Sequence, residues 1–345
     1  MAGSSQDLGV GMKELVDEKL NIFLRKNGVT DVLSYTQILA GRNSEVYKIT
    51  SLNRSFILKK YSQSNHDKRD RLGAEFGFLA YLENLNISMV ARPLAIDQEQ
   101  NIALYSYLIG SRVTDITSMY ISQAAEFIRV INLSSSTPLA MKLPMASDAC
   151  SSWQDHLKLV KLRIERLQQL QPVNKLEKEA QEFVVSKLIP KWLQLNRNIE
   201  IEMTKLDNGI SSSGRIISPS DFGFHNILEN QGQLYFLDFE YAGWDDPVKL
   251  ICDFICQPEL AVSQIQGEQF LLEVSGHLPQ PEKIKQFVQL LLPIHRLKWC
   301  CILLNEFRLE DRCRRLHAGI SSQGLLAGQI SKANWYFNKH LNLLT

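Results

Sequence analysis

Three oxygen-bearing side chains, Asp221, Asn226 and Asp238, have a spacing that can gather them around one cation. Between Asn226 and Asp238 the sequence predicts a short hairpin with a turn at Asn230-Gln231-Gly232, where glycine supplies the positive φ. Strands that rise about 3.3 Å per residue go out and come back, so the three side chains should meet at one end of the hairpin. Mg²⁺ prefers such oxygen ligands and takes phosphate oxygens as further partners. The spacing therefore predicts a magnesium site that serves phosphoryl transfer.

Kinase chemistry has a role for each of these side chains. A loop Asp orients the attacking hydroxyl, an Asn five residues later holds a metal ion, and an Asp beyond the hairpin joins the metal to the phosphates. Asp221, Asn226 and Asp238 fit this order. The alternative is that Asp221 and Asn226 are ordinary turn residues and that Asp238 only ends a strand. The ordered triple around a hairpin favours the chemical interpretation.

The same residues resemble the aminoglycoside phosphotransferase and choline kinase-like family of small-molecule kinases. Its hallmark is a His-Gly-Asp-x-x-x-x-Asn loop followed by Ile-Asp-Trp-Glu and Gly-x-x-Asp-Pro. The chain has Ser-Asp-Phe-Gly-Phe-His-Asn at 220–226, Leu-Asp-Phe-Glu at 237–240 and Gly-Trp-Asp-Asp-Pro at 243–247. The resemblance implies a protein kinase-like two-lobe α+β fold, ATP and Mg²⁺ as cofactors, and a small-molecule hydroxyl as acceptor. It assigns catalysis to Asp221 and metal binding to Asn226 and Asp238.

The catalytic loop departs from the family pattern at one position. The family's His falls on Pro219, which concerns the geometry of the loop more than the transfer itself. Asp221-Phe222-Gly223 imitates the metal-binding triplet of protein kinases, but it precedes the hairpin and so occupies the catalytic-loop position. His225 either braces the loop in place of the missing His or touches substrate. Glu240 and Asp246 either orient Asp238, meet the acceptor or are structural.

The residues before 110 are expected to bind the nucleotide. Strands are predicted at 33–39, 45–50 and 55–61, and Phe56-Ile-Leu-Lys59 resembles the kinase strand whose Lys reaches the α and β phosphates. Alternation sends Lys60 to the opposite face. The connection at 40–44 is either a plain hairpin loop or, as the resemblance implies, a phosphate cradle of backbone N–H groups with Asn43 and Ser44.

A helix predicted over 67–84 carries one acid on its apolar stripe. Glu75 lies three residues after Leu72 and four before Leu79. A carboxylate on a buried face requires a partner, because an unpaired one costs several kcal/mol. Lys59 is the expected partner, and the alternative is that Glu75 lies at the solvated edge of the stripe.

The domain organisation follows from these elements. We expect a tail and helix over 1–28, an N-lobe with the nucleotide-binding sheet and helix over 29–108, and a helical C-lobe over 109–345 with a catalytic loop at 218–226 and a metal loop at 237–247. A hinge is expected at 109–111. Helices are predicted at 118–131, 153–170, 175–196 with a break at Pro190, 248–256, 259–274, 281–316 and 325–344.

Composition narrows the class of protein and its location. The chain has 345 residues, 45% hydrophobic and 22% charged, with 38 Lys and Arg against 37 Asp and Glu. This balance leaves no strong net charge, so no overall electrostatic field favours binding to nucleic acid or to an anionic membrane. The six cysteines form no Cys-x-x-Cys pair, so reduced thiols are expected. The N-terminal residues lack a signal-peptide pattern and no run reaches the roughly 18 apolar residues of a membrane helix, which predicts a cytoplasmic protein.

Two rival functions stay open. A kinase-fold nucleotide-binding module without turnover is suggested by Pro219 and by the single glycine at 41–45. A protein kinase is disfavoured, because 243–247 and a predicted helix follow Asp238 almost at once and leave no evident room for an activation segment. The identity of the acceptor lies beyond what the sequence indicates.

Overall fold

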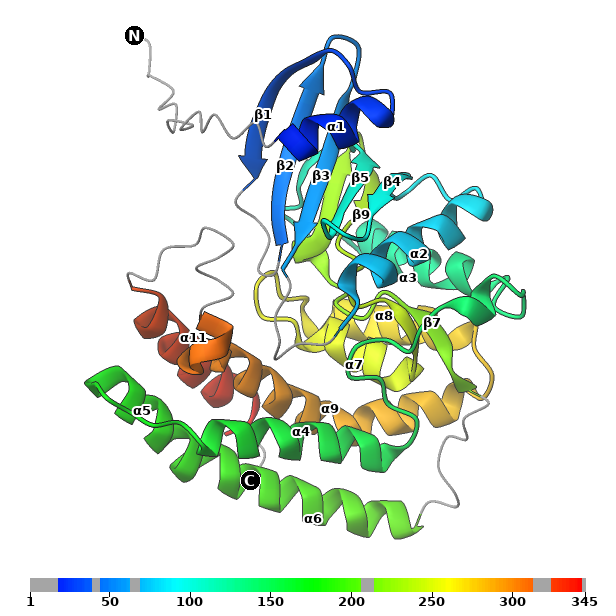
Figure 1. The fold of residues 1–345 in the computed structure, drawn as a ribbon. Coiled ribbons are helices and arrows are strands. Elements are labelled where there is room, and N and C mark those ends of the chain that lie inside the picture. The colour runs from blue at the N-terminus through cyan, green and yellow to red at the C-terminus, as the bar shows by residue number, and fades with distance from the viewer. Residues whose placement is uncertain (1–17, 39–43, 63–68, 206–213, 313–323, 343–345) are drawn as a thin grey trace, which may run out of the picture.

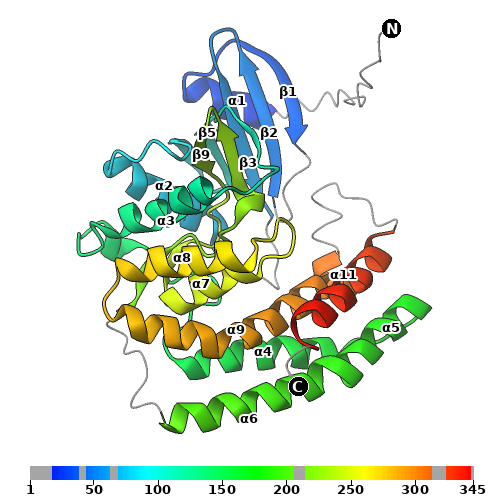
Figure 2. The ribbon, with the colours of Figure 1, turned by 180° about the vertical axis from the view of Figure 1, so that it is seen from behind.

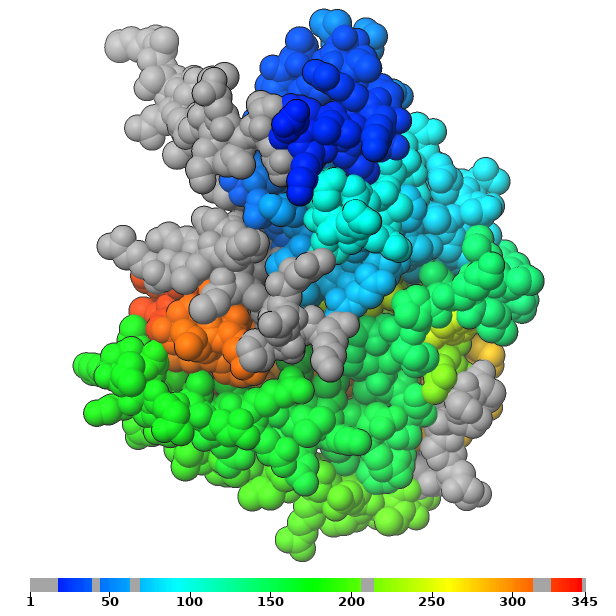
Figure 3. All heavy atoms as spheres, viewed as in Figure 1, coloured from blue at the N-terminus to red at the C-terminus, as the bar shows by residue number. Residues whose placement is uncertain are grey.

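A computed structural model describes residues 18–38, 44–62, 69–205, 214–312 and 324–342. A small antiparallel sheet with two helices sits on a larger, mainly helical part, as Figures 1 and 2 show from opposite sides. With all heavy atoms drawn, the blue and cyan sheet part rests on the green and orange helical part (Figure 3). The fold is the α+β, protein kinase-like two-lobe arrangement that the resemblance implied.

The small lobe is a five-stranded antiparallel sheet between two helices. The strand order is β1-β2-β3-β5-β4. Its elements are α1 (Glu18–Lys26), β1 (Val32–Ile38), β2 (Ser44–Ser51), β3 (Ser55–Tyr61), α2 (Arg71–Asn84), β4 (Pro93–Asp97) and β5 (Ile102–Ser106). The predicted three-strand meander and the helix after it are confirmed. The described part of the first helix begins at Glu18, and residues 1–17 of the expected tail and helix lie outside the described residues.

Alternation along β3 decides which side chains reach the interior of the molecule. Phe56 and Leu58 pack in a small core with Phe23 and Leu24 of α1. Lys59 and Tyr61 are buried on the other face, whereas Lys60 between them is exposed. Because successive side chains of a strand point to opposite faces, Lys59 necessarily faces α2 if Leu58 faces α1.

The predicted hairpin is present as β8 (Ile227–Asn230) and β9 (Gln233–Phe236), in full antiparallel register. Its two-residue loop has positive φ at both Gln231 (52°) and Gly232 (82°), the pattern of a type I′ turn, whose twist matches that of the strands. β6 (Ser111–Arg112) pairs with β8 and adds a third strand. The segment that leaves β5 is thereby tied to the helical part directly after the expected hinge.

The large lobe consists mostly of helices. They are α3 (Ser118–Asn132), α4 (Trp153–Gln168), α5 (Lys175–Phe183), α6 (Ile189–Lys205), α7 (Pro247–Cys256), α8 (Gln264–Gly276), α9 (Pro281–Leu303) and α11 (Leu325–His340). α9 packs against α4 and α7, so these three helices share one core. A short sheet of β7 (Ile216–Ser218) and β10 (Gly243–Asp245) brackets the catalytic and metal loops.

Several predicted boundaries differ from the observed ones. A break is expected at Pro190, and the structure has a π-helical turn over Val184–Leu188 just before it. Proline lacks an N–H and its ring clashes with the carbonyl four residues earlier, so the irregular turn precedes the proline. α8 starts at Gln264 rather than 259, since Ser263 and Gln266 form a capping box. α9 ends at Leu303 and is followed by a 3₁₀ turn, η5 (Asn305–Phe307).

One helical stretch is apolar enough to be compared with a membrane span. The most apolar 18-residue window within Pro281–Phe307 has a mean hydropathy of 1.5, and 67% of that window is buried in the fold. Its buried side chains include Leu291 and Leu297, which belong to the main core. The apolar character of this stretch is thus accounted for by packing inside the protein.

Candidate active site

Lys59 joins the two lobes at the centre of the candidate site. Its Nζ lies 2.7 Å from Glu75 Oε2 and 2.8 Å from Asp238 Oδ1. Burial alone would lower the pKa of Lys59, but the carboxylates of Asp238, Glu75 and Glu240 raise it well above its usual value. The lysine is therefore a fixed positive charge between β3, α2 and the metal loop.

Tyr61 holds Glu75 by a hydrogen bond, and Tyr105 contacts Tyr61 in turn. The Tyr61 hydroxyl donates to Glu75 Oε2 at 2.6 Å and lies 2.8 Å from the Tyr105 hydroxyl. Burial and the Glu75 charge raise the pKa of Tyr61 well above its usual value, so the phenol keeps its proton. Glu75 thus receives hydrogen bonds on both sides of its carboxylate, and its orientation toward Lys59 is fixed.

The catalytic loop holds Asp221 and Asn226 next to each other. Asn226 Nδ2 donates to the backbone oxygen of Asp221 at 3.1 Å, and His225 Nε2 lies 3.3 Å from Asp221 Oδ1. Ser220, directly before Asp221, has a left-handed φ of 67°. Its N–H donates to Ser218 Oγ at 3.0 Å, a local contact that supports this uncommon conformation. His225 therefore contacts the Asp221 carboxylate across the loop, in a chain that has Pro219 where the family has His.

Phenylalanine rings fix both loops to the core. The Phe222 ring stacks on those of Phe127 and Phe236 with centroids 5.9 Å and 5.6 Å away. Phe239, next to Asp238, lies 4.9 Å from Phe78 of α2. Aromatic pairs of this kind add about 0.5–1.5 kcal/mol beyond the area they bury. The loops carry polar side chains on one side and are anchored by apolar rings on the other.

The hairpin brings Asp238 back beside Asn226. The N–H of Leu237 donates to the Asn226 carbonyl at 3.0 Å, so the metal-loop residue follows a direct backbone contact with the catalytic loop. Asp238 has a left-handed φ of 64° and a side chain that is 36% exposed. The side-chain N–H of Asn226 donates to the Asp221 backbone oxygen, so the side-chain oxygen of Asn226 remains available as a metal ligand. This donor set of one carboxylate and one amide oxygen suits Mg²⁺.

Glu240 is a buried acid behind Asp238. Its Oε1 lies 3.7 Å from Arg71 Nε, and both side chains are almost fully buried. Burial and the Asp238 charge raise the pKa of Glu240 to about 7, against the opposing effect of Lys59 and Arg71. Asp246, by contrast, accepts from Val248 N at 2.7 Å and caps α7, a structural contact.

A cavity of about 1110 Å³ opens beside Asp221 and Glu240. Among the residues that the structure describes, its wall includes Arg69 and Asp70 before α2, the segment 144–148, and parts of α4, α7 and α9. Lys59 does not appear in that wall. Gly243 lets the 144–148 segment approach, because a Cβ there would lie 2.3 Å from the Pro144 oxygen. The cavity therefore borders Asp221 and Glu240 but not Lys59.

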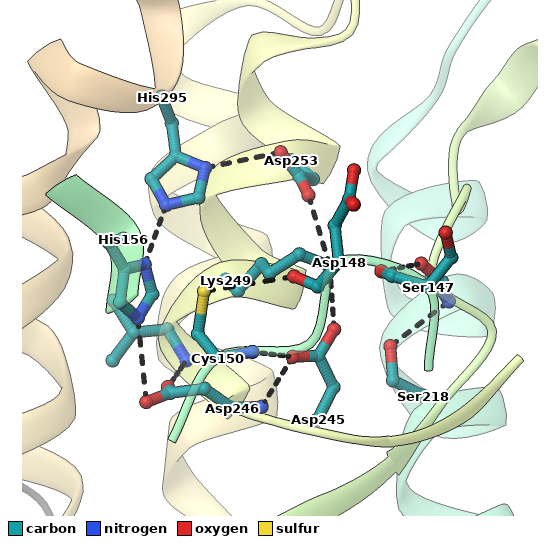
Figure 4. A network of polar contacts seen from close by, with 12 residues as sticks. Ser147, Asp148, Cys150, His156, Ser218, Asp245, Asp246, Lys249, Asp253 and His295 are labelled. Atoms are coloured by element: carbon teal, nitrogen blue, oxygen red, sulfur yellow. Dashed lines mark hydrogen bonds and ion pairs between the residues drawn. The ribbon is translucent and has the colours of Figure 1, made fainter. Parts of the chain in front are cut away.

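A buried polar network forms the floor of this cavity and is drawn in Figure 4. His295 of α9 contacts a residue on each side of its ring. Its Nδ1 lies 3.2 Å from Oδ1 of Asp253 on α7, and its Nε2 lies 2.8 Å from Nδ1 of His156 on α4. Lys298 also contacts Asp253, and its charge holds the pKa of that carboxyl well below its usual value despite burial. An ionised Asp253 requires a proton on His295 Nδ1, so His295 Nε2 accepts from His156 Nδ1. The network locks three helices together.

The structure brings most of the predicted site residues together. Glu75 and Asp238 both contact Lys59, and Asp221 and Asn226 share one loop. Ser44 is buried at the start of β2, opposite Tyr61 in the register. Asn43 lies outside the described residues.

Sequence reasoning missed several residues of the site. Tyr61 lies two residues after Lys59 on the same strand face, so alternation alone was a usable signal. Arg71 and the two buried histidines gave no such signal. Their partners, Glu240, Asp246 and Asp253, are distant in the sequence. The five described cysteines are free and buried, as expected for reduced thiols.

Comparison with known proteins agrees with this geometry. Residues 34–272 match the model of the phosphotransferase enzyme family. No curated protein sequence matches the chain. A choline kinase from Cryptosporidium parvum Iowa II has a similar fold, with TM-score 0.61, 15% identity, 93% of this chain and 99% of that chain covered. Spectinomycin phosphotransferase, solved with ADP and spectinomycin, has a TM-score of 0.61 and 14% sequence identity. The match covers 92% of this chain and 98% of that chain.

A third neighbour is amicoumacin kinase in complex with AMP-PNP, Ca²⁺ and its antibiotic, with TM-score 0.55, 15% identity and 94% of each chain covered. At such identities these structures show a shared fold. The family model, in contrast, spans both the lysine strand and the catalytic and metal loops. By this match the chain belongs to the phosphotransferase enzyme family and is an enzyme of the small-molecule kinase type.

Proposed function

We propose that the protein transfers the γ-phosphoryl group of ATP, with Mg²⁺, to a hydroxyl group of a small molecule. The observation that supports this most directly is the position of Lys59, which contacts both Glu75 and Asp238 while Asp221 and Asn226 lie on the adjoining loop. A fixed cation, a pair of oxygen ligands and a loop carboxylate are the parts that phosphoryl transfer requires.

Each residue has a proposed role in this reaction. Lys59, oriented by Glu75, contacts the α and β phosphates, and Ser44 with Asn43 and nearby backbone N–H groups cradles them. Asn226 and Asp238 would hold Mg²⁺, which when bound would neutralise charge on the phosphates. Residues 29–108 then form the nucleotide lobe and the segment after β5 the hinge, with the acceptor bound by residues of 109–345.

Asp221 is the proposed catalytic residue. It orients the acceptor hydroxyl and takes its proton, while the hydroxyl oxygen forms a bond to the γ phosphorus. The bond from that phosphorus to the β–γ bridging oxygen breaks, and ADP leaves with the bridging oxygen. The cavity beside Asp221 provides room for an acceptor, because 1110 Å³ is at the upper end of ligand-pocket volumes, which run to about 1,000 Å³.

A nucleotide-binding module without turnover is the second candidate, motivated by Pro219 in place of the family's His. The preserved contacts of Lys59, Asp221 and Asp238 weigh against it. A protein kinase is disfavoured, since β10 and α7 begin only five and nine residues after Asp238, at Gly243 and Pro247. The balanced charge and the free, buried cysteines agree with a cytoplasmic enzyme that needs neither nucleic acid nor a membrane.

The test is an unbiased metabolite screen for Mg·ATP consumption by the purified protein, with Asp221→Asn as control. The proposal expects at least one hydroxyl compound to be phosphorylated by the wild type and not by the variant. Tight Mg·ATP binding without transfer to any compound would establish the second candidate instead. Phosphorylation on a peptide array would favour a protein kinase.

A further inference from the structure

The wall of the cavity beside Asp221 carries two cations without a direct partner in the described part of the chain. Lys142 and Arg166 line the cavity and are exposed, and neither has an ion-pair or hydrogen-bond partner among the described residues. Arg166 stands three residues after Arg163, so the two guanidinium groups share one face of α4. Lys142 closes the short η1 turn (Ala140–Lys142) that leads into the 144–148 segment.

Most acids in the same wall already have partners. Asp148 forms an ion pair with Arg163, and Asp253 forms one with Lys298. Glu310 and Asp311 both form ion pairs with Arg308. Asp70 caps α2 by accepting from the N–H of Gly73 at 2.8 Å. These carboxylates are therefore not available to compensate Lys142 and Arg166.

Hydrogen-bond donors are also left over in this wall. Trp299 of α9 is 8% exposed and its indole N–H has no acceptor in the described part of the chain. The Nε of Arg163 is likewise buried without an acceptor there. Both groups can only donate hydrogen bonds, so a ligand that binds them must supply hydrogen-bond acceptors. An anionic oxygen group satisfies such donors and the free cations together.

Two arginines already occupy the Tyr241 ring in the cavity wall. Tyr241 lines the cavity next to Glu240, and the guanidinium carbons of Arg69 and Arg71 lie 5.3 Å and 5.7 Å from its ring centroid. An ammonium ligand would compete with these arginines for the ring and be repelled by their charge.

We propose that the acceptor carries an anionic group, a carboxylate or a phosphate, in addition to the hydroxyl that Asp221 engages. Lys142 and Arg166 bind this group and fix the distance between it and the reacting hydroxyl. The proposal rests on the function proposed above, with the same transfer from ATP to the hydroxyl oxygen and ADP as the leaving group. It excludes neutral polyols and amino alcohols as the preferred acceptors.

The experiment compares four compounds with one polyhydroxyl chain and different charge: gluconate, glucitol 6-phosphate, glucitol and glucamine. Phosphorylation is followed by ADP release, and binding in the presence of Mg·ADP is measured by calorimetry. One or both anionic compounds should bind best and be the better acceptors, and the one that wins identifies carboxylate or phosphate as the group. The variant Lys142→Gln/Arg166→Gln should raise KM or Kd for it by about tenfold or more, with kcat nearly unchanged.

Lys158→Gln is the matched control, because Lys158 is exposed on the same helix and does not line the cavity. A preference for glucitol or glucamine, or an anion affinity that the double variant leaves unchanged, overturns the inference. Preference for glucamine that is lost in Glu306→Gln would place a cationic group at that buried acid instead. Absence of binding by both anionic compounds also overturns it.

Failure of the proposed function would look different. In that case no compound of any charge would be phosphorylated, while binding of gluconate or glucitol 6-phosphate would still depend on Lys142 and Arg166. The binding arm thus decides the charge of the ligand even where the transfer arm gives no product.

Discussion

The ammonium of Lys59 lies 2.7 Å from the carboxylate of Glu75, and this contact ties β3 to α2 in front of the metal loop. Both side chains are buried, at 8% and 3% exposure, so the pair is held in a low-dielectric setting where its charges interact strongly. Asp238 adds a second carboxylate to the same lysine. Removal of the lysine would leave two acids facing each other without a cation.

Lys59→Met is expected to reduce kcat/KM for Mg·ATP by about 10²–10³, because it removes the preorganised charge that we propose contacts the phosphates. Lys60→Met is the matched control. Lys60 is adjacent but exposed on the other face of β3, so its loss should change stability by no more than about 0.5 kcal/mol and leave the rates nearly unchanged. Equal losses in the two variants would contradict the assignment of Lys59.

Tyr61→Phe is expected to destabilise the protein by about 1.5–3 kcal/mol, since it removes a buried hydrogen bond to the charged Glu75. Urea unfolding of the wild type, Tyr61→Phe, Glu75→Gln and the double variant completes a cycle. Because the two groups are in contact, the cycle should give a coupling energy above about 0.5 kcal/mol. Strict additivity would show that the tyrosine does not hold Glu75.

The sequence was sufficient to predict the parts of the site that follow from local periodicity. The register of the kinase-like strand motif selected Lys59, and alternation on β3 then placed Lys60 on the opposite face. The apolar stripe of α2 placed Glu75, and a turn signal placed the hairpin between Asn226 and Asp238. Apart from the choice of lysine, these conclusions need only the geometry of one strand, one helix or one turn.

What could not be predicted depends on contacts between distant segments. The pairing of Arg71 with Glu240 joins residues 169 positions apart in the numbering, and that of His156 with His295 joins residues 139 apart. No periodicity within either segment encodes such a pair. The left-handed φ of Asp238, 64°, was also not predictable, because Asp adopts this conformation only where the surroundings hold it.

Glu240 is expected to make stability fall as pH rises. Its pKa is raised to about 7 in the folded protein from an ordinary value of 4.5, so the folded state holds this proton more tightly than the unfolded state does. The stability it contributes is complete below the unfolded pKa and is lost as pH rises through about 7. Glu240→Gln does not titrate. Relative to wild type, its stability should therefore rise by up to about 3 kcal/mol from acidic to alkaline pH.

The measurement is urea unfolding of both proteins in metal-free buffer at several pH values on either side of 7. Metal is left out because Asp238, whose charge helps to raise the Glu240 pKa, is a proposed metal ligand. A stability difference that does not change with pH would show that the Glu240 carboxyl titrates as it does in the unfolded chain, and one that changes with the opposite sign would show that its pKa is lowered.

His295 is expected to have the opposite influence on stability. Burial and the nearby Lys298 lower its pKa from 6.5 to about 3, so the folded protein keeps it neutral while the unfolded chain takes up a proton. The stability it contributes is complete above the unfolded pKa of 6.5 and is lost as pH falls toward about 3. This loss amounts to about 1.4 kcal/mol per pH unit within that window.

His295→Asn removes this titration while keeping an amide N–H that can donate to Asp253. At neutral pH the variant should be less stable by about 1–3 kcal/mol, because His156 Nδ1 loses its acceptor. Below pH 6.5 the wild type weakens faster, so the difference should shrink as pH falls. In the wild type, Lys298, Asp253 and His156 surround the His295 ring. A difference that is constant from pH 8 to pH 4.5 would show that the pKa of His295 is the same in the folded and the unfolded protein.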